Sequence, residues 1–287
     1  MMAILKRELK SYFLTPIGYL YMGFFLLVAG VFFTFGNLLP RSSYFTSFLS
    51  GVLFVYLFAI PLLTMRLFSE ERRQRTDQLL LTSPVSIPEI VLGKFLAAYA
   101  VYLLTLAVTV MYALVVGIHG DLAVWETLGS YIGFILLGAS YISVGVFVSA
   151  GTENQLTSAL VSFFSLLIIW LIDPISQAVP SDLAAGIVSA AVLVGAVCGY
   201  LYINTRNRYL AAGAAFLGAL IIAALYFVDK GVYIGFIRKF LGWFSLNKRY
   251  ESFSMGILKI DSLVYYVSFS GLFLFLTVRL IEKRRWN

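Results

Sequence analysis

The sequence predicts an all-α, polytopic membrane protein, and three observations lead to this fold class. Apolar residues make up 61% of the 287-residue chain, whereas charged residues make up only 12%. Soluble globular domains carry about 25% charged residues, so the composition excludes an ordinary soluble protein. The apolar residues also gather in long stretches that are almost free of charge, as they do in membrane-spanning helices.

Eight apolar stretches are candidate membrane spans, because a spanning helix needs about 20 mainly apolar residues. They are 17–38, 45–67, 90–117, 125–149, 155–173, 183–204, 209–228 and 262–281. The first is too long for the apolar core of a signal peptide, so we expect it to stay in the protein. Since little sequence remains between the spans, we expect residues 1–287 to form a single transmembrane domain.

The distribution of basic residues predicts the orientation in the membrane. With a cytoplasmic N-terminus, most of the 21 Lys and Arg residues fall in cytoplasmic segments, as the positive-inside rule requires. Both termini would then be cytoplasmic. The net charge of +7 would reflect membrane orientation rather than binding of nucleic acid.

Residues 1–15 predict an amphipathic interface helix that lies in the cytoplasmic headgroup layer. Lys6, Arg7 and Lys10 fall mostly on one helical face, and the apolar side chains fall on another. The apolar face would hold Ile4, Leu5, Leu9, Tyr12 and Phe13. Pro16 then allows the chain to turn into the first span.

A charged stretch lies between the second and third candidate spans, on the predicted cytoplasmic side. Residues 70–77 contain three acids and three arginines, and this balance argues against a polybasic lipid-binding patch. The pairs Glu71–Arg75 and Arg73–Asp77 have i,i+4 spacing and favour a helix. We expect a short helix over 69–84, with a charged half and an apolar half, that can dock into a partner's cleft. An ordinary loop kept in water by its charges is the alternative that these residues leave open.

Helix stop and start signals follow the charged stretch. Thr82, Ser83 and Pro84 are expected to end the short helix. Ser86, with Glu89 three residues later, forms a capping-box pattern for the next helix.

The segment 229–261 predicts short amphipathic helices on the extracytoplasmic side. Aromatic residues such as Phe236 and Phe240 alternate with Arg238 and Lys239, which is the spacing of helices that rest on a membrane surface. A gate cap, a docking surface for an extracytoplasmic partner and a partly buried connector all remain open.

Other features give no sign of a catalytic or metal site. Cys198 is the only cysteine and His119 the only histidine, so neither a disulfide within the chain nor a Cys/His metal cluster is expected. The sequence contains no G-x-x-x-x-G-K-[S/T] loop for nucleotide phosphates. Gly195 and Gly199 form a G-x-x-x-G pattern, for which we expect close packing within the hairpin 183–228, with subunit dimerisation as the alternative.

The run EERRQRTDQLLLTSPVSIPEIVLGKFLA, residues 70–97, resembles the signature of ABC-2 type transporter permeases. The positions that carry this resemblance are Glu71, Thr76, Leu80, Leu81, Pro84, Ile90, Val91, Gly93, Lys94 and Ala97. Residues 253–266 also resemble the segment that leads into the last helix of this family. The closest type within the family is the gliding-motility permease called GldF.

The resemblance implies a type V exporter-like transmembrane domain with six core spans, to which 183–228 would add an inserted hairpin. It further implies a half-transporter, in which each of two permease subunits grips a separate ATP-binding subunit through a cytoplasmic coupling helix. Residues 69–84 would be this coupling helix, and the turn 151–154 a second contact. The implied contact residues are Glu70, Glu71, Arg72, Arg73, Arg75, Thr76, Asp77, Leu80, Leu81, Gly151, Thr152, Glu153 and Asn154.

The chain would then be a permease without an ATPase site, located in the inner or plasma membrane of a prokaryote, and not itself an enzyme. ATP and Mg²⁺ would be bound by the partner subunit, and no cofactor by this chain. Expected partners are the ATP-binding subunit, a second copy or a related permease, the lipid bilayer and an extracytoplasmic protein, but no nucleic acid. The substrate would be exported, and the nearly charge-free middles of the spans leave room for an amphiphile.

Two other classes of function stay open at this point. A secondary transporter or channel would work without ATP, although charged groups inside the spans, which mark ion relays, are scarce here. A noncatalytic membrane anchor in a gliding or secretion machine is the other class. The residues do not identify the substrate. They are equally compatible with a homodimer and with a heterodimer of related permeases.

Overall fold

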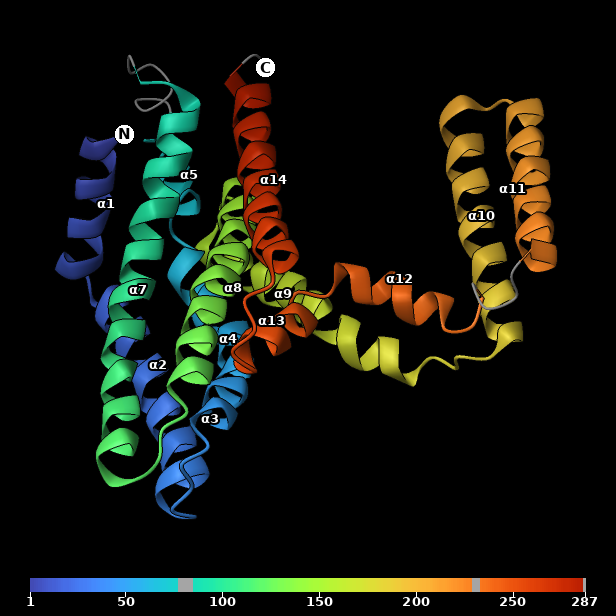
Figure 1. The fold of residues 1–287 in the computed structure, drawn as a ribbon. Helices are drawn as coiled ribbons and strands as arrows, with labels where there is room; N and C mark the ends of the chain where they lie inside the picture. The colour runs from blue at the N-terminus through green and yellow to red at the C-terminus, as the bar shows by residue number, and fades with distance from the viewer. Residues whose placement is uncertain (77–84, 229–232, 286–287) are drawn as a thin grey trace. The chain divides into compact units, whose positions relative to one another are not determined.

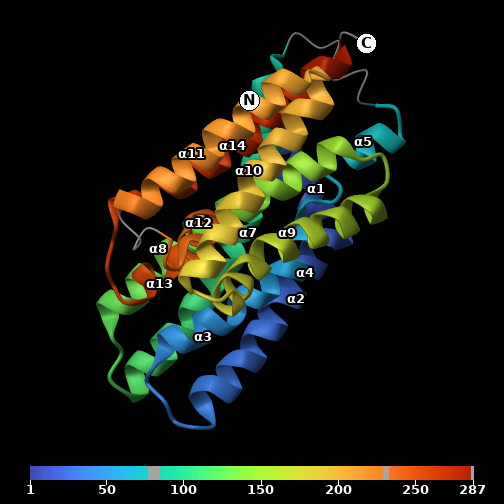
Figure 2. The same cartoon turned by 90° about the vertical axis from the view of Figure 1, so that its right-hand side faces the viewer.

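The computed structural model describes residues 1–76, 85–228 and 233–285, and these residues form helices and no β-strand. The chain divides into two units, which are Met1–Ile169 with Arg249–Asn287, and Trp170–Lys248. Figures 1 and 2 show the fold from two directions.

The first unit is a bundle of long helices. Its elements are α1 (Met2–Leu14), α2 (Pro16–Phe33), the π-helix η1 (Thr34–Leu38), α3 (Phe45–Val52), the 3₁₀ turn η2 (Leu53–Val55), α4 (Tyr56–Thr64), α5 (Ser69–Arg73), α7 (Ile87–His119), α8 (Val124–Gly151) and α14 (Ile260–Arg285). Helix α9 (Gln155–Ala178) begins in this unit, and α13 (Asn247–Ser254) ends in it. Both ends of the chain lie at the same end of the bundle as α5 (Figures 1 and 2).

The second unit contains the helical hairpin of α10 (Leu183–Thr205) and α11 (Arg208–Val228), followed by α12 (Phe236–Phe244). Arg206 caps α10 in the left-handed conformation, with a φ of 50°, and so turns the chain into α11. The hairpin packs where Gly218 meets Val194, because a Cβ at Gly218 would lie 2.3 Å from Val194 Cγ1. A Cβ at Gly195 or Gly199 would meet no atom within 4 Å. The prediction that this glycine pair packs within the hairpin is therefore wrong.

The predicted fold class is confirmed. Among the described residues, seven helices are long and apolar enough to cross a membrane: Pro16–Leu38, Phe45–Arg73, Ile87–His119, Val124–Gly151, Gln155–Ala178, Leu183–Thr205 and Ile260–Arg284. The eighth predicted span corresponds to α11, whose described apolar part, Arg208–Ala224, is shorter. The division of residues 1–287 into spans, interface segments and an inserted hairpin stays a prediction.

Helix α7 is longer than a bilayer's hydrocarbon core is thick. Its 33 residues span about 50 Å at 1.5 Å per residue, whereas the hydrocarbon core of a bilayer is about 30 Å thick. The helix therefore extends beyond the apolar layer, and its first turns can carry polar contacts.

Helix α1 packs against these first turns of α7. A Cβ at Gly93 would lie 3.0 Å from Ile4 Cγ2 and 3.3 Å from the Met1 carbonyl oxygen, so glycine allows the two helices to approach closely. Ile4 and Tyr12 are buried, and the Tyr12 hydroxyl donates a hydrogen bond to the Leu63 carbonyl at 2.6 Å. This corrects the expectation for residues 1–15: the predicted helix forms, but protein covers at least part of the face assigned to lipid.

Small residues of α8 let its neighbours pack closely. Gly138 faces the ring of Tyr102 on α7, and Gly145 faces Thr64 at the end of α4. Tyr102 also donates a hydrogen bond to the Phe134 carbonyl at 2.7 Å. Helix α8 is thereby fixed between α4 and α7, and its last residue, Gly151, reaches the end of the bundle where α5 lies.

Substitution of Gly145 tests this close packing. A Cβ at residue 145 would lie 2.2 Å from Thr64 Oγ1 and 2.8 Å from Thr64 Cβ, so Gly145→Ala should destabilise the folded state by about 1–3 kcal/mol through overpacking. Thermal unfolding of the purified protein in detergent, followed by circular dichroism, measures the effect. Gly23→Ala is the matched control, because its Cβ would meet no atom within 4 Å. Equal midpoints for the two variants would contradict the α4–α8 contact.

Candidate functional site

The charged stretch after α4 begins as a short helix held by backbone and serine contacts. Ser69 Oγ donates a hydrogen bond to the Met65 carbonyl oxygen. Ser149 Oγ of α8 accepts one from the Phe68 amide at 3.1 Å and donates one to Met65 at 3.2 Å. These contacts fix the start of α5 against the end of α8.

The predicted helix over 69–84 ends early in the part of the chain that the structure describes. Helix α5 stops at Arg73, and Arg75 adopts a left-handed conformation with a φ of 56°. The Thr76 amide then closes the turn on the Glu71 carbonyl at 2.9 Å. Residues 77–84, including the predicted contact residues Asp77, Leu80 and Leu81, lie outside the described residues.

The predicted i,i+4 pair of Glu71 and Arg75 is replaced by longer-range pairs. Glu71 binds Arg7 Nη2 at 2.7 Å and Lys94 Nζ at 3.0 Å, so its carboxylate pairs with α1 and α7.

The structure also corrects the predicted capping box at Ser86. Ser86 is the N-cap residue of α7, but its side chain makes no cap hydrogen bond, and Glu89 lies 4.0 Å from the N-terminal amine.

Lys94 is the centre of a buried ion cluster. Its side chain is only 1% exposed. The ammonium contacts Glu8 Oε1 at 3.1 Å and Glu71 Oε2 at 3.0 Å, and donates a hydrogen bond to the Leu67 carbonyl at 2.5 Å. These three acceptors match the three donors of an ammonium group. The cluster therefore joins α1, α5 and α7 through one side chain.

Arg7 shares both carboxylates with Lys94. Its Nη2 lies 2.6 Å from Glu8 Oε1 and 2.7 Å from Glu71 Oε1. Burial by itself would raise the pKa of Glu8, but the nearby Lys94 ammonium and Arg7 guanidinium outweigh burial and lower this pKa below its usual value. Glu8 therefore stays ionised, and the cluster stays charged, in the folded protein at neutral pH.

A second arginine ties α1 to the end of the second span. Arg66 donates hydrogen bonds to Ser11 Oγ and Thr15 Oγ1, both at 2.7 Å. It also pairs with Glu70 at 3.2 Å and lies 5.8 Å from the centre of the Tyr12 ring. Glu70 thus stabilises α5 locally, and Arg66 links that helix to α1.

The two predicted contact segments meet directly. Arg72 of α5 binds Glu153 at 2.7 Å and lies 3.4 Å from the Gly151 carbonyl oxygen. Arg284 of α14 donates a hydrogen bond to the Ala150 carbonyl at 2.7 Å, so it satisfies a carbonyl at the end of α8 that has no partner within its helix. Helices α5, α8 and α14 therefore converge on the turn 151–154.

The remaining predicted contact residues divide into structural and exposed groups. Thr152 Oγ1 donates to the Val148 carbonyl at 3.1 Å, and Asn154 Oδ1 accepts from the Leu156 amide at 3.0 Å at the start of α9. Arg73, Arg75 and Glu153 are exposed. The exposed Arg73 and Arg75 are available to a partner, and so is the outer part of Glu153, although Glu153 also pairs with Arg72.

A cavity of about 390 Å³ opens beside the ion cluster, lined by Arg7, Glu8, Ser11, Arg66, Leu67, Glu70, Glu71, Gln74, Thr76 and Lys94. Its three cationic side chains are balanced by three carboxylates, so it does not concentrate charge of one sign for a substrate. Within the described residues, no group of three His, Cys, Asp or Glu side chains is placed to hold a metal ion. The arrangement is suited to joining helices mechanically.

Sequence reasoning did not identify Glu8, Lys94 and Arg66 as members of this site. Lys94 carried a signal, because it is a lone charge near the start of the apolar stretch 90–117, and a buried lysine requires a carboxylate partner. Nothing in the local sequence indicates which carboxylate, since Glu8 lies 86 residues earlier.

Comparison with known protein families matches residues 34–176 to the family described as ABC-2 family transporter protein. The matched segment includes α5, Lys94 and the turn 151–154. It supports the ABC-2 permease class for this chain, and with the seven apolar helices it indicates a multi-pass membrane protein. A comparison with curated proteins found no relative that matches.

Removal of the Lys94 ammonium tests the ion cluster. Lys94→Met keeps a long unbranched side chain but leaves Glu8 and Glu71 without their shared buried cation. We expect a loss of about 3 kcal/mol in folding stability, measured as a lower midpoint of thermal unfolding in detergent. Lys10→Met on the exposed side of α1 should leave the midpoint unchanged. If both variants unfold like the unsubstituted protein, the cluster does not stabilise the fold.

The pH dependence of stability tests the charge of Glu8. A carboxylate with a lowered pKa stabilises the folded state fully above its unfolded pKa of 4.5, and this contribution is lost as the pH falls through the lower folded value. Thermal unfolding midpoints between about pH 6 and about pH 3 should therefore fall more steeply for the unsubstituted protein than for Glu8→Gln. Parallel curves would show that Glu8 titrates alike in the folded and unfolded states.

Proposed function

We propose that this chain, a membrane protein of the ABC-2 permease class, is the transmembrane permease subunit of an ATP-driven transporter. It would couple ATP hydrolysis by a separate nucleotide-binding subunit to export of a substrate. The observation that carries the proposal is the Arg72–Glu153 ion pair at 2.7 Å, because it unites the two segments that the family resemblance implies as contacts with the ATPase.

The ion cluster supplies a route for motion from this contact. A partner that binds the exposed Arg73, Arg75 and Glu153 would push or pull on α5. Glu71 connects α5 to Lys94 of α7 and to Arg7 of α1. Since Lys94 and Glu71 are largely buried, a displacement of α5 would carry α7 along with it.

The rest of the proposal follows from the family and from the apolar spans. ATP and Mg²⁺ would bind in the partner subunit, and a second copy or a related permease would complete the transport route. Both termini and α5 lie at one end of the bundle (Figures 1 and 2), which supports placing them together on the cytoplasmic side of a prokaryotic inner membrane. An amphiphilic substrate suits spans with few fixed charges, and we propose a likeness to the gliding-motility type of permease.

We propose that the predicted extracytoplasmic segment acts as a gate through α13, which packs on the bundle. Gly129 and Gly133 of α8 let Phe253 of α13 approach closely, with a Cβ at Gly129 lying 2.4 Å from the Phe253 carbonyl oxygen. Tyr250 and Phe253 are buried. Trp243 and Phe244 of α12 are exposed and are suited to contact lipid or an extracytoplasmic partner.

Substitution of the exposed arginines tests the docking role of α5. Arg73→Glu with Arg75→Asn changes the charge outside the ion cluster, and asparagine tolerates the left-handed backbone at residue 75. The pair should weaken copurification with the proposed ATP-binding subunit by about tenfold. Stimulation of ATP hydrolysis should fall in parallel.

The matched control is Lys239→Glu on α12, which changes the charge of another exposed cation and should leave assembly intact. Unchanged assembly in the double variant would refute the docking role of α5. Transport by the chain alone in liposomes, driven by an ion gradient without ATP, would instead favour a secondary transporter.

A further inference from the structure

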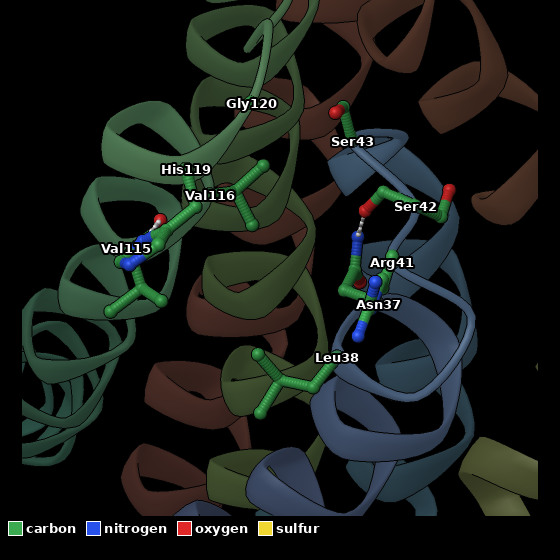
Figure 3. A pocket seen from close by; sticks show the side chains of 9 residues that line it. All are labelled: Asn37, Leu38, Arg41, Ser42, Ser43, Val115, Val116, His119 and Gly120. Atoms are coloured by element: carbon green, nitrogen blue, oxygen red, sulfur yellow. Dashed lines mark hydrogen bonds between the residues drawn. The ribbon is translucent and has the colours of Figure 1, made fainter.

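A second cavity lies between the segment after α2 and the end of α7, at the opposite end of the first unit from α5 (Figure 1). It has a volume of about 390 Å³. It lies between the segment 37–43 and the last turn of α7, and is lined by Asn37, Leu38, Arg41, Ser42, Ser43, Val115, Val116, His119 and Gly120. In Figure 3, Asn37 and Arg41 occupy one wall, and His119 and Val115 occupy the other.

The backbone around this cavity is held by specific contacts. The π-helix η1 ends with a hydrogen bond from the Leu39 amide to the Thr34 carbonyl at 2.9 Å, and π-helical turns are frequent at functional sites. Arg41 is left-handed, with a φ of 52°. A Cβ at Gly120 would lie 2.5 Å from Ser43 Oγ, so the Ser43 side chain packs closely against the end of α7.

Asn37 contributes a hydrogen-bond acceptor that lacks a donor. Its residue is only 3% exposed. Its Nδ2 donates to the Ser42 carbonyl at 3.0 Å, and since a carbonyl can only accept, this bond fixes the orientation of the amide. Oδ1 has no hydrogen-bond partner among the described residues. A buried acceptor left in this state costs about 1–3 kcal/mol, which a bound donor would recover.

Arg41 and His119 supply complementary groups. The exposed Arg41 guanidinium brings a permanent positive charge and a fork of donors that suits phosphate. His119 Nδ1 lies 3.0 Å from the Val115 carbonyl oxygen, so the proton of the neutral ring sits on Nδ1, and Nε2 is an acceptor. The cavity therefore offers one cation and two acceptors, beside the apolar walls of Leu38, Val115 and Val116.

We propose that this cavity binds a phosphate-bearing group that carries neighbouring hydroxyls, with glycerol phosphate as the simplest example. Arg41 binds the phosphate, and Asn37 Oδ1 and His119 Nε2 accept hydrogen bonds from the hydroxyls. Such a group can come from a phosphatidylglycerol headgroup or from a soluble phosphorylated polyol. The proposal does not depend on the transport function, because binding requires neither ATP nor a partner.

Binding of defined probes to the full chain tests this site. In detergent, isothermal titration calorimetry with sn-glycerol 3-phosphate, inorganic phosphate and glycerol compares the complete ligand with its parts. In lipid nanodiscs, native mass spectrometry compares retained phosphatidylglycerol with retained phosphatidylcholine. For a soluble ligand, we expect glycerol 3-phosphate to bind at least about tenfold more tightly than inorganic phosphate, which lacks the hydroxyls, or glycerol, which lacks the charge. For a lipid ligand, we expect phosphatidylglycerol to bind at least about tenfold more tightly than phosphatidylcholine, which lacks the glycerol hydroxyls.

Variants assign the binding to the cavity. Arg41→Asn removes the charge but tolerates the left-handed backbone, and Asn37→Leu removes the unpaired acceptor. Each should weaken binding by about tenfold. Arg206→Asn is the matched control, since Arg206 is also exposed and left-handed, with a φ of 50°, but lies in the second unit. Size-exclusion chromatography checks folding, and Arg41→Asn carries the test if Asn37→Leu misfolds.

The outcomes are distinct. Selective retention of phosphatidylglycerol without binding of glycerol 3-phosphate supports the site and identifies its ligand as a lipid. The reverse result supports the site and identifies a soluble ligand. The proposal is overturned if no probe binds selectively, or if Arg41→Asn binds like Arg206→Asn. Full binding by a folded Asn37→Leu variant overturns the role of the hydroxyls.

Discussion

The buried ammonium of Lys94 is the constraint on which the end of the bundle near α5 depends. A cation that is 1% exposed is tolerated only when its charge and donors are satisfied, because desolvation of an ion costs several kcal/mol. Glu8 from α1 and Glu71 from α5 satisfy the charge, and the Leu67 carbonyl takes the third donor. Helices α1, α5 and α7 therefore have to assemble together, and none of them can shift alone without exposing an unpaired charge.

The cavities at the two ends of the first unit differ in whether their polar groups are paired. Near α5, three cations and three carboxylates line the cavity, and Arg72 and Arg284 fasten the turn 151–154 to α5 and α14. At the far end, the cavity beside η1 is incomplete, since Asn37 Oδ1 lacks a donor among the described residues. Between the ends, glycines such as Gly138 and Gly145 keep α8 in close contact with α7 and α4.

The sequence predicted what depends on local pattern and missed what depends on distant partners. Apolar stretches predicted the long helices, including α7 and α8, because twenty apolar residues are sufficient to indicate a span. The same pattern could not predict that α5 ends at Arg73. The i,i+4 spacing of Glu71 and Arg75 favoured a longer helix, but Glu71 pairs instead with Arg7, 64 residues away, and with Lys94. The unpaired acceptor of Asn37 likewise depends on the tertiary packing around η1, which the local sequence does not specify.

The distance along the chain between Glu8 and Lys94 has a consequence for biosynthesis. Lys94 is added 86 residues after Glu8, which takes roughly 4–17 s at ribosomal rates of about 5–20 residues per second. During that interval, the lysine that neutralises Glu8 does not yet exist. Helix α1 therefore cannot make its contact with Lys94 until the first turns of α7 have been synthesised.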